Sequence, residues 1–198
     1  AGGVFALDAS GNMYLAESVN RTIRKISPTG LVTTLAGKAG ESGSADGTGA
    51  QARFRHPYAM AVDAANQVYV VDDLDHTVRK ITPSGVVSTL AGLAGSSGST
   101  DGMGSAARFH TPRGIAVDSS ANVYVTDSGN YTLRLITPEG QVSTIVGSAG
   151  DTGISSGKID GTGTAAHFSG PYGVAIDASG NAYVAESSHI IRKIELST

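Results

Sequence analysis

The chain has no cysteine and no tryptophan, and charged residues make up only 16% of its 198 positions. The lack of cysteine excludes disulfide scaffolds, thiolate zinc sites, iron–sulfur clusters and cysteine nucleophiles. With a net charge of −3, the chain has no overall positive potential that would attract a polyanion, so we expect no nucleic-acid partner. No apolar run approaches the roughly eighteen residues of a membrane helix, so we expect no membrane insertion.

What the chain has in abundance is glycine, with 27 residues, and an internal repeat. Aligning the sequence with itself places three residue types in register at intervals of 55, 55 and about 59 residues. We place the copies at approximately 2–57, 58–112, 113–171 and 172–198. The registered positions are Asp8, Asp63, Asp118 and Asp177; Tyr14, Tyr69, Tyr124 and Tyr183; and Arg24, Arg79, Arg134 and Arg192.

Each complete copy contains four short runs of β-forming residues, which in the second copy span 60–62, 68–71, 77–81 and 86–90. Turn signals separate the runs, and a Pro-x-Gly turn joins the third run to the fourth. Four up-and-down strands per repeat are typical of a β-propeller blade. We therefore predict an all-β single domain over 1–198, a β-propeller of four-stranded antiparallel blades. Three blades are complete, and the fourth lacks its outer strand.

Segments 114–118, 122–127 and 132–136 resemble the NHL repeat, and the resemblance extends over nearly the whole chain. Connectors that end in Ala-Arg-Phe, at 52–54 and 107–109, add to it. The resemblance implies that each copy is a propeller blade, commonly one of six. Here the count is lower, so we expect the ring to be completed by further blades of a longer parent chain or by a partner chain. An unusual four-bladed arrangement is the alternative.

The repeated polar residues are predicted to be structural, because a catalytic residue has no reason to be copied into every blade. Asp8 and its equivalents are expected to bond turn backbone, and Arg24 and its equivalents to pair with an acid seven residues earlier, or six in the fourth copy. The connector Asp-Gly pairs, such as Asp46-Gly47, fit neither a calcium loop nor a phosphate cradle and are interpreted as turns. Residues 153–157 match G-x-S-x-G, but no strand and helix flank them, so we predict no hydrolase elbow.

The copies differ mainly in the loop between their second and third strands and in the segment before their first strand. Both are expected on one face of the propeller, where loops on a rigid scaffold carry binding. Acidic residues interrupt this face, which argues against RNA. We predict no catalytic residue and no cofactor. The candidate binding residues are Arg21, Arg55, His56, Tyr58, Asp73, Asp75, His76, His110, Arg113, Tyr131, His167, Tyr172 and His189.

All five histidines fall on this predicted face, which raises the question of a metal. Some NHL-like lyases, by resemblance, hold a metal with histidines in the central channel. The histidines here occupy unlike repeat positions, so a zinc or calcium site is only a minor alternative.

The leading hypothesis is a non-enzymatic binding module, extracellular or periplasmic, whose partner is a protein or a small polar ligand such as a glycan. One alternative is a lyase or lactonase-type enzyme with a divalent metal in the channel. Another is a structural building block that assembles through unclosed blade ends, either as a homo-oligomer or with further blades.

Overall fold

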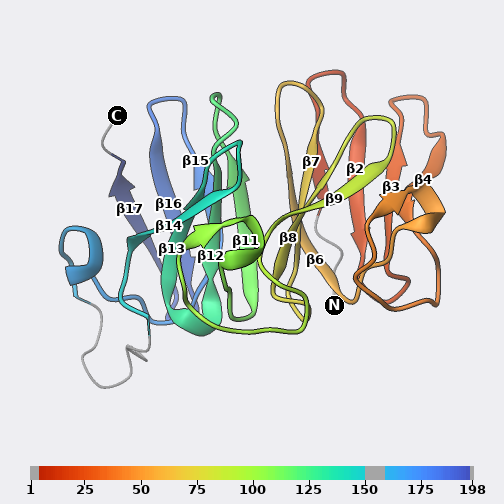
Figure 1. Ribbon diagram of the computed structural model, residues 1–198. Coiled ribbons are helices and arrows are strands. Elements are labelled where there is room, and N and C mark those ends of the chain that lie inside the picture. The colour runs from red at the N-terminus through yellow and green to blue at the C-terminus, as the bar shows by residue number, and fades with distance from the viewer. Residues whose placement is uncertain (1–4, 150–158, 197–198) are drawn as a thin grey trace.

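The computed structural model describes residues 5–149 and 159–196, which form four antiparallel sheets side by side (Figure 1). The first sheet contains β1 (Phe5–Leu7), β2 (Met13–Glu17), β3 (Thr22–Ile26) and β4 (Val32–Gly37). The second contains β6 (Pro57–Val62), β7 (Val68–Asp72), β8 (Thr77–Ile81) and β9 (Val86–Ala91). The third contains β11 (Pro112–Val117), β12 (Val123–Asp127), β13 (Thr132–Ile136) and β14 (Gln141–Val146). The fourth contains β15 (Pro171–Ile176), β16 (Asn181–Glu186) and β17 (Ile190–Glu195).

The sheets are the blades of a β-propeller, which confirms the predicted fold class. The first three blades have their four main strands, and the described part of the fourth has three. Two short strands were not predicted: β5 (Gly47–Thr48) and β10 (Gly102–Met103) pair with the outer strands β9 and β14. The connectors also contain the 3-10 turns η1 (Gly49–Gln51), η2 (Gly104–Ala106) and η4 (Gly163–Ala165), while η3 (Ser128–Asn130) lies in a loop.

The repeated aspartate organises the turn between the first two strands, as predicted. In the first blade Asp8 Oδ1 accepts the N–H groups of Ser10 and Asn12 at 3.0 and 2.8 Å. Asp8 Oδ2 also accepts the phenol O–H of Tyr14 at 3.1 Å, a bond that was not predicted. Burial, reinforced by the Asp8 carboxylate, raises the pKa of Tyr14 to about 12. The tyrosine therefore ties the turn to the sheet.

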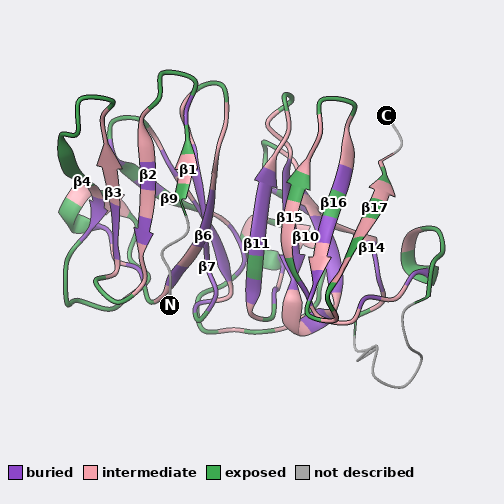
Figure 2. Cartoon of the chain, turned by 180° about the vertical axis from the view of Figure 1, so that it is seen from behind, coloured by how far each residue is buried: buried purple, intermediate pink, exposed green. Residues whose placement is uncertain are grey.

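The core lies between neighbouring blades, and Figure 2 shows the buried residues concentrated in the middle of the strands. Phe54, Phe109 and Phe168 from the connectors are almost fully buried in these layers. The predicted arginine–acid pairs form in three blades, from 3.8 Å for Arg24–Glu17 to 2.8 Å for Arg134–Asp127. In the second blade Arg79 pairs instead with Asp46 of the connector, at 2.6 Å.

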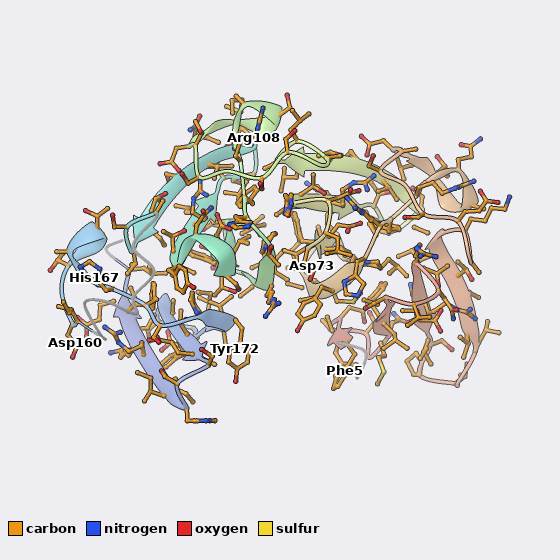
Figure 3. All side chains as sticks on the ribbon, turned by 90° about the horizontal axis from the view of Figure 1, so that it is seen from below. Phe5, Asp73, Arg108, Asp160, His167 and Tyr172 are labelled. Atoms are coloured by element: carbon orange, nitrogen blue, oxygen red, sulfur yellow. The ribbon has the colours of Figure 1, made fainter. Side chains whose placement is uncertain are left out.

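The inner strands β1, β6, β11 and β15 are neighbours in that order, so the blades form an arc. In Figure 3, Phe5 of the first blade and Tyr172 of the fourth lie on either side of the open inner space. Within residues 5–149 and 159–196 no strand of the first blade pairs with one of the fourth. The same residues contain no helix long and apolar enough to cross a membrane. The G-x-S-x-G match at 153–157 lies outside the described residues.

Candidate functional site

The loop after the second strand of one blade meets the segment before the inner strand of the next blade. Ser18 Oγ donates a hydrogen bond to the carbonyl of Pro57 at 2.8 Å, and Ser128 Oγ donates to that of Pro171 at 2.5 Å. These bonds join the first blade to the second and the third to the fourth. The two kinds of variable segment therefore lie on one face, and the blades position them rigidly.

One candidate position has the same backbone in all four blades. Arg21, His76, Tyr131 and His189 directly precede the third strand, with φ of 60°, 58°, 59° and 64°. This left-handed conformation is uncommon for residues other than glycine. The four residues that the sequence repeat places at one position therefore also share one backbone conformation, and only the side chain differs between blades.

The candidates of the second blade bind one another. His56 Nδ1 lies 2.6 Å from Asp73 Oδ1, and Arg55 Nη1 lies 3.7 Å from Asp75 Oδ1. Asp73 and Asp75 are each only 5% exposed, although both were expected on the binding surface. Their carboxylates hold the loop together, because an acid this deeply buried requires a partner.

The acid at the end of the second strand has a role that sequence reasoning missed. Asp72 accepts the backbone N–H groups of Arg55 and His56, both at 2.7 Å, and Asp127 accepts that of His110 at 2.7 Å. Glu186 accepts the N–H of Ser169 in the same way. Loss of hydration raises the pKa of Asp72 to about 6. These acids fix the chain where it enters the inner strand of their own blade, and backbone partners leave no signal in sequence.

A groove of about 390 Å³ lies on this face across the second, third and fourth blades. Four candidates line it: Tyr58, Arg113, Tyr131 and Tyr172. Three of them are the second residues of the inner strands β6, β11 and β15, so equivalent positions converge on one space. The other lining residues are Thr111, Ser128, Gly129, Gly170, Pro171 and Ser187.

Arg113 is the charged group of the groove. Its guanidinium carbon lies 5.9 Å from the centroid of the Tyr58 ring, and its side chain is exposed. Within the described part of the chain it makes no ion pair and no hydrogen bond, in contrast to Arg55, which binds Leu74 O and Asp75. The groove therefore combines an available cation with three tyrosines, an arrangement that attracts anions and packs against flat rings.

The remaining candidates lie outside the groove. His76 Nδ1 accepts the N–H of Thr111 at 3.1 Å, and its ring meets that of His110 edge-on with centroids 6.0 Å apart. Burial, aided by His110, lowers the pKa of His76. Figure 3 shows His167 beside Asp160 at the outer edge of the arc, away from Tyr172. His167 is therefore separated from the groove.

Arg21 points to the connector, where it approaches Gly40 O at 3.5 Å, and His189 is exposed beside the fourth blade. Across residues 5–149 and 159–196, no three histidine, aspartate or glutamate side chains gather as ligands for a metal ion.

Comparison with known proteins agrees with this architecture. The family model described as NHL repeat matches residues 109–134, which run from the end of the connector into β13. The chain therefore contains an NHL repeat at these residues. It is 31% identical over 132 residues to Protein SUPPRESSOR OF QUENCHING 1, chloroplastic, of Arabidopsis thaliana, a match that covers 62% of this chain and 12% of that protein.

Two solved structures match the fold of the whole arc. One is a structural genomics protein of unknown function from Bacteroides thetaiotaomicron, with a TM-score of 0.78 and 30% identity over 96% of this chain and 46% of that one. The other is an auxiliary nutrient binding protein from Bacteroides ovatus, with a TM-score of 0.75 and 23% identity over 98% of this chain and 48% of that one. The chain thus spans about half the length of these structures and a smaller share of the curated relative.

Proposed function

We propose that the chain is a binding module and that its groove takes a small polar ligand bearing a carboxylate, with an acidic glycan as the best fit. The observation that carries this proposal is the guanidinium of Arg113, which lies among Tyr58, Tyr131 and Tyr172 and has no ion-pair partner among the described residues. A guanidinium binds a carboxylate through two parallel hydrogen bonds. Tyrosine rings offer flat apolar faces with a polar edge, which suits sugar rings.

The surroundings of the groove support recognition by a rigid surface. Ser128, which lines the groove, bonds to the carbonyl of Pro171, and the preceding residue Asp127 is held by its buried pair with Arg134. A site held in this way loses little conformational entropy when the ligand binds. The nutrient-binding description of the Bacteroides ovatus structure agrees with a role in ligand capture, and such a role fits a location outside the cytoplasm.

Calorimetric titration with acidic and neutral oligosaccharides of matched length tests the proposal. We expect the wild-type protein to prefer the acidic series and Arg113→Gln to bind it about ten-fold or more weakly. Tyr172→Ala should weaken binding of both series, because the side chain is 48% exposed and supplies contact area. The thermal midpoints of both variants should stay near the wild-type value.

Arg55→Gln is the matched control, since Arg55 is also an exposed arginine of this face but lies outside the groove. Equal binding of acidic and neutral sugars, unchanged in Arg113→Gln, would overturn the ligand class. Metal-dependent release of a cleaved or unsaturated product from the same sugars would instead favour the lyase or lactonase alternative.

A further inference from the structure

The junction between the second and third blades differs from the junctions on either side of it. Ser18 and Ser128 each bond to the proline carbonyl at the start of the next inner strand. The residue at the equivalent position of the second blade is Asp73, and its carboxylate binds a histidine of its own blade instead. On this face the bond between the second and third blades runs from Thr111 N–H to His76 Nδ1, at 3.1 Å.

The second blade shows why the N–H of Thr111 turns to another acceptor. There one carboxylate, that of Asp72, accepts the N–H groups of both residues that precede the proline. In the third blade Asp127 accepts only the first of these two groups, at 2.7 Å, because its other oxygen binds Arg134 at 2.8 Å. The second N–H, that of Thr111, is bound by the imidazole of His76 in the neighbouring blade.

Thr111 adopts a backbone conformation that its residue type disfavours. Its φ is +50°, in the left-handed region, where a β-branched residue is an outlier. Thr111 also directly precedes Pro112, and the residue before a proline favours an extended conformation. The equivalent residue of the fourth blade is Gly170, which takes φ of +77° without this penalty. Strain of this kind persists only where the surroundings support it, and the bond to His76 provides support here.

The strained residue belongs to the groove. Thr111 lines it, and Arg113, which supplies its charged group, follows two positions later. The intervening Pro112 is buried and has a fixed φ, so the orientation of Thr111 is passed on to Arg113. His110, which precedes Thr111, is fixed in its own blade, where its carbonyl accepts the N–H of Gly129 at 2.8 Å. A change at the N–H of Thr111 therefore reaches the guanidinium of the groove.

Only the neutral imidazole of His76 can accept this bond. Nδ1 accepts a backbone N–H through its lone pair, whereas both ring nitrogens of an imidazolium are donors. Burial lowers the pKa of His76, and the His110 ring and the Arg55 guanidinium also disfavour its charged form. The Asp75 carboxylate and the backbone carbonyl of Asp73 act in the opposite direction, but Asp75 is itself paired with Arg55 at 3.7 Å. The bond is therefore present at neutral pH and is lost when His76 takes up a proton.

We propose that His76 positions the Arg113 side of the groove through Thr111, and that the groove binds its ligand while His76 is neutral and releases it when His76 is protonated. The inference rests on the proposed function for the class of ligand. Protonation places two N–H groups face to face at the junction of the second and third blades, and Thr111 then relaxes from its left-handed conformation. The groove thus holds an acidic ligand near neutral pH and gives it up in mildly acidic surroundings.

Nuclear magnetic resonance tests the coupling without any ligand. In the wild-type protein we expect the neutral His76 ring to carry its proton on Nε2, and the Thr111 amide signal to shift as that ring titrates. His76→Asn is the informative variant, since asparagine suits a left-handed backbone and its Oδ1 takes the place of Nδ1 without titrating. In this variant the part of the Thr111 shift that follows the His76 ring should be absent. A proton on Nδ1 of the neutral ring, or a Thr111 signal that does not follow His76, would overturn the proposal.

Calorimetric titration with an oligogalacturonate, whose carboxylates stay ionised throughout, measures the effect on binding. We expect the wild-type protein to bind it about ten-fold more weakly at about pH 5 than at about pH 7.5. His76→Asn should remove this difference. His76→Phe, which has no acceptor, should bind about ten-fold more weakly at both values, and Tyr131 shows that the same backbone position accepts an aromatic residue.

His189→Asn is the matched control, because His189 occupies the equivalent position of the fourth blade and is exposed. It should keep the wild-type pH profile. The same pH dependence in His76→Asn as in the wild type would assign the effect to another group, such as Asp127 with its pKa of about 6, and would overturn the proposal. Absence of oligogalacturonate binding at every pH would contradict the proposed ligand class alone, and the resonance measurements would still decide the positioning role of His76.

Discussion

Arg134 and Asp127 form an ion pair of 2.8 Å in which neither side chain is exposed to solvent. Asp127 also accepts hydrogen bonds from Asn130 Nδ2 and from the backbone of His110, both at 2.7 Å. The pair therefore links the interior of the third blade to the loop and to the segment that border the groove. A change at this pair reaches both the stability and the binding face.

Removing one partner of this pair should be strongly destabilising. Asp127→Ala leaves the Arg134 guanidinium buried beside an empty site, and we expect a loss of about 3–5 kcal/mol in the free energy of unfolding. Urea denaturation followed by circular dichroism measures it. Glu195→Gln, which removes an exposed pair with Lys193, is the control and should change little. A loss at Asp127 no larger than that of the control would contradict this account.

A second prediction concerns Gly92, at the end of the outer strand of the second blade. Its φ is +93°, and a Cβ there would lie 2.4 Å from the carbonyl oxygen of His76. Gly92→Ala should therefore lose more than the roughly 1–2 kcal/mol of a left-handed conformation alone. Gly40→Ala isolates the conformational part, since Gly40 has φ of +80° with no atom near its Cβ position. Similar losses in the two variants would show that the strand relaxes without penalty.

The third prediction is a pH dependence that originates at Asp72. Loss of hydration raises the folded-state pKa of Asp72 from 3.8 to about 6. The folded protein then holds this proton more tightly than the unfolded chain does. The contribution of Asp72 to the free energy of unfolding is fully present below about pH 4 and is lost as the pH rises through about 6. The total loss is up to about 3 kcal/mol.

Asp72→Asn should flatten that part of the profile. Denaturation series between about pH 4 and pH 7 for the two proteins give the difference directly. A difference that is constant across this range, or one that grows with pH in favour of the wild type, would refute the assignment.

The outer side of the fourth blade leads to a fourth prediction. Ile191 is 73% exposed and Tyr183 is 36% exposed, whereas their equivalents in the second blade, Val78 and Tyr69, are buried against the third. Exposed apolar surface of this kind promotes association. Light scattering should give a mass that rises with concentration above 19.9 kDa, and Ile191→Glu should reduce the rise. A constant monomer mass for the wild type would contradict it.

The blades could be predicted from sequence because their determinants are local and recur in every copy. Asp8 bonds backbone within four residues, and Gly30 follows its proline by two, with φ of +84°. Both features read directly as turns. The strand order then follows, because short turns join neighbouring antiparallel strands.

The site was harder to predict because its contacts are distant in sequence. Arg113 and Tyr58 are brought together by the packing of two inner strands, and no spacing rule relates them. The burial of Asp73 and Asp75 depends on the segment at 55–56, which precedes them by a whole hairpin. Asp46 was interpreted as a turn residue, and its bond to Thr89, which is 43 positions away, emerges only from the fold.

The shared left-handed backbone at Arg21, His76, Tyr131 and His189 has a consequence for engineering. Four unlike side chains occupy one backbone setting, so the side chain at this position can be exchanged one blade at a time without redesign of the scaffold. Among the four, Tyr131 lines the groove, so its exchange acts on the proposed site directly. The left-handed backbone limits which residue types fit at this position: asparagine and histidine suit it, and β-branched residues do not. A combinatorial library restricted in this way would sample new recognition surfaces while most of its members remained folded.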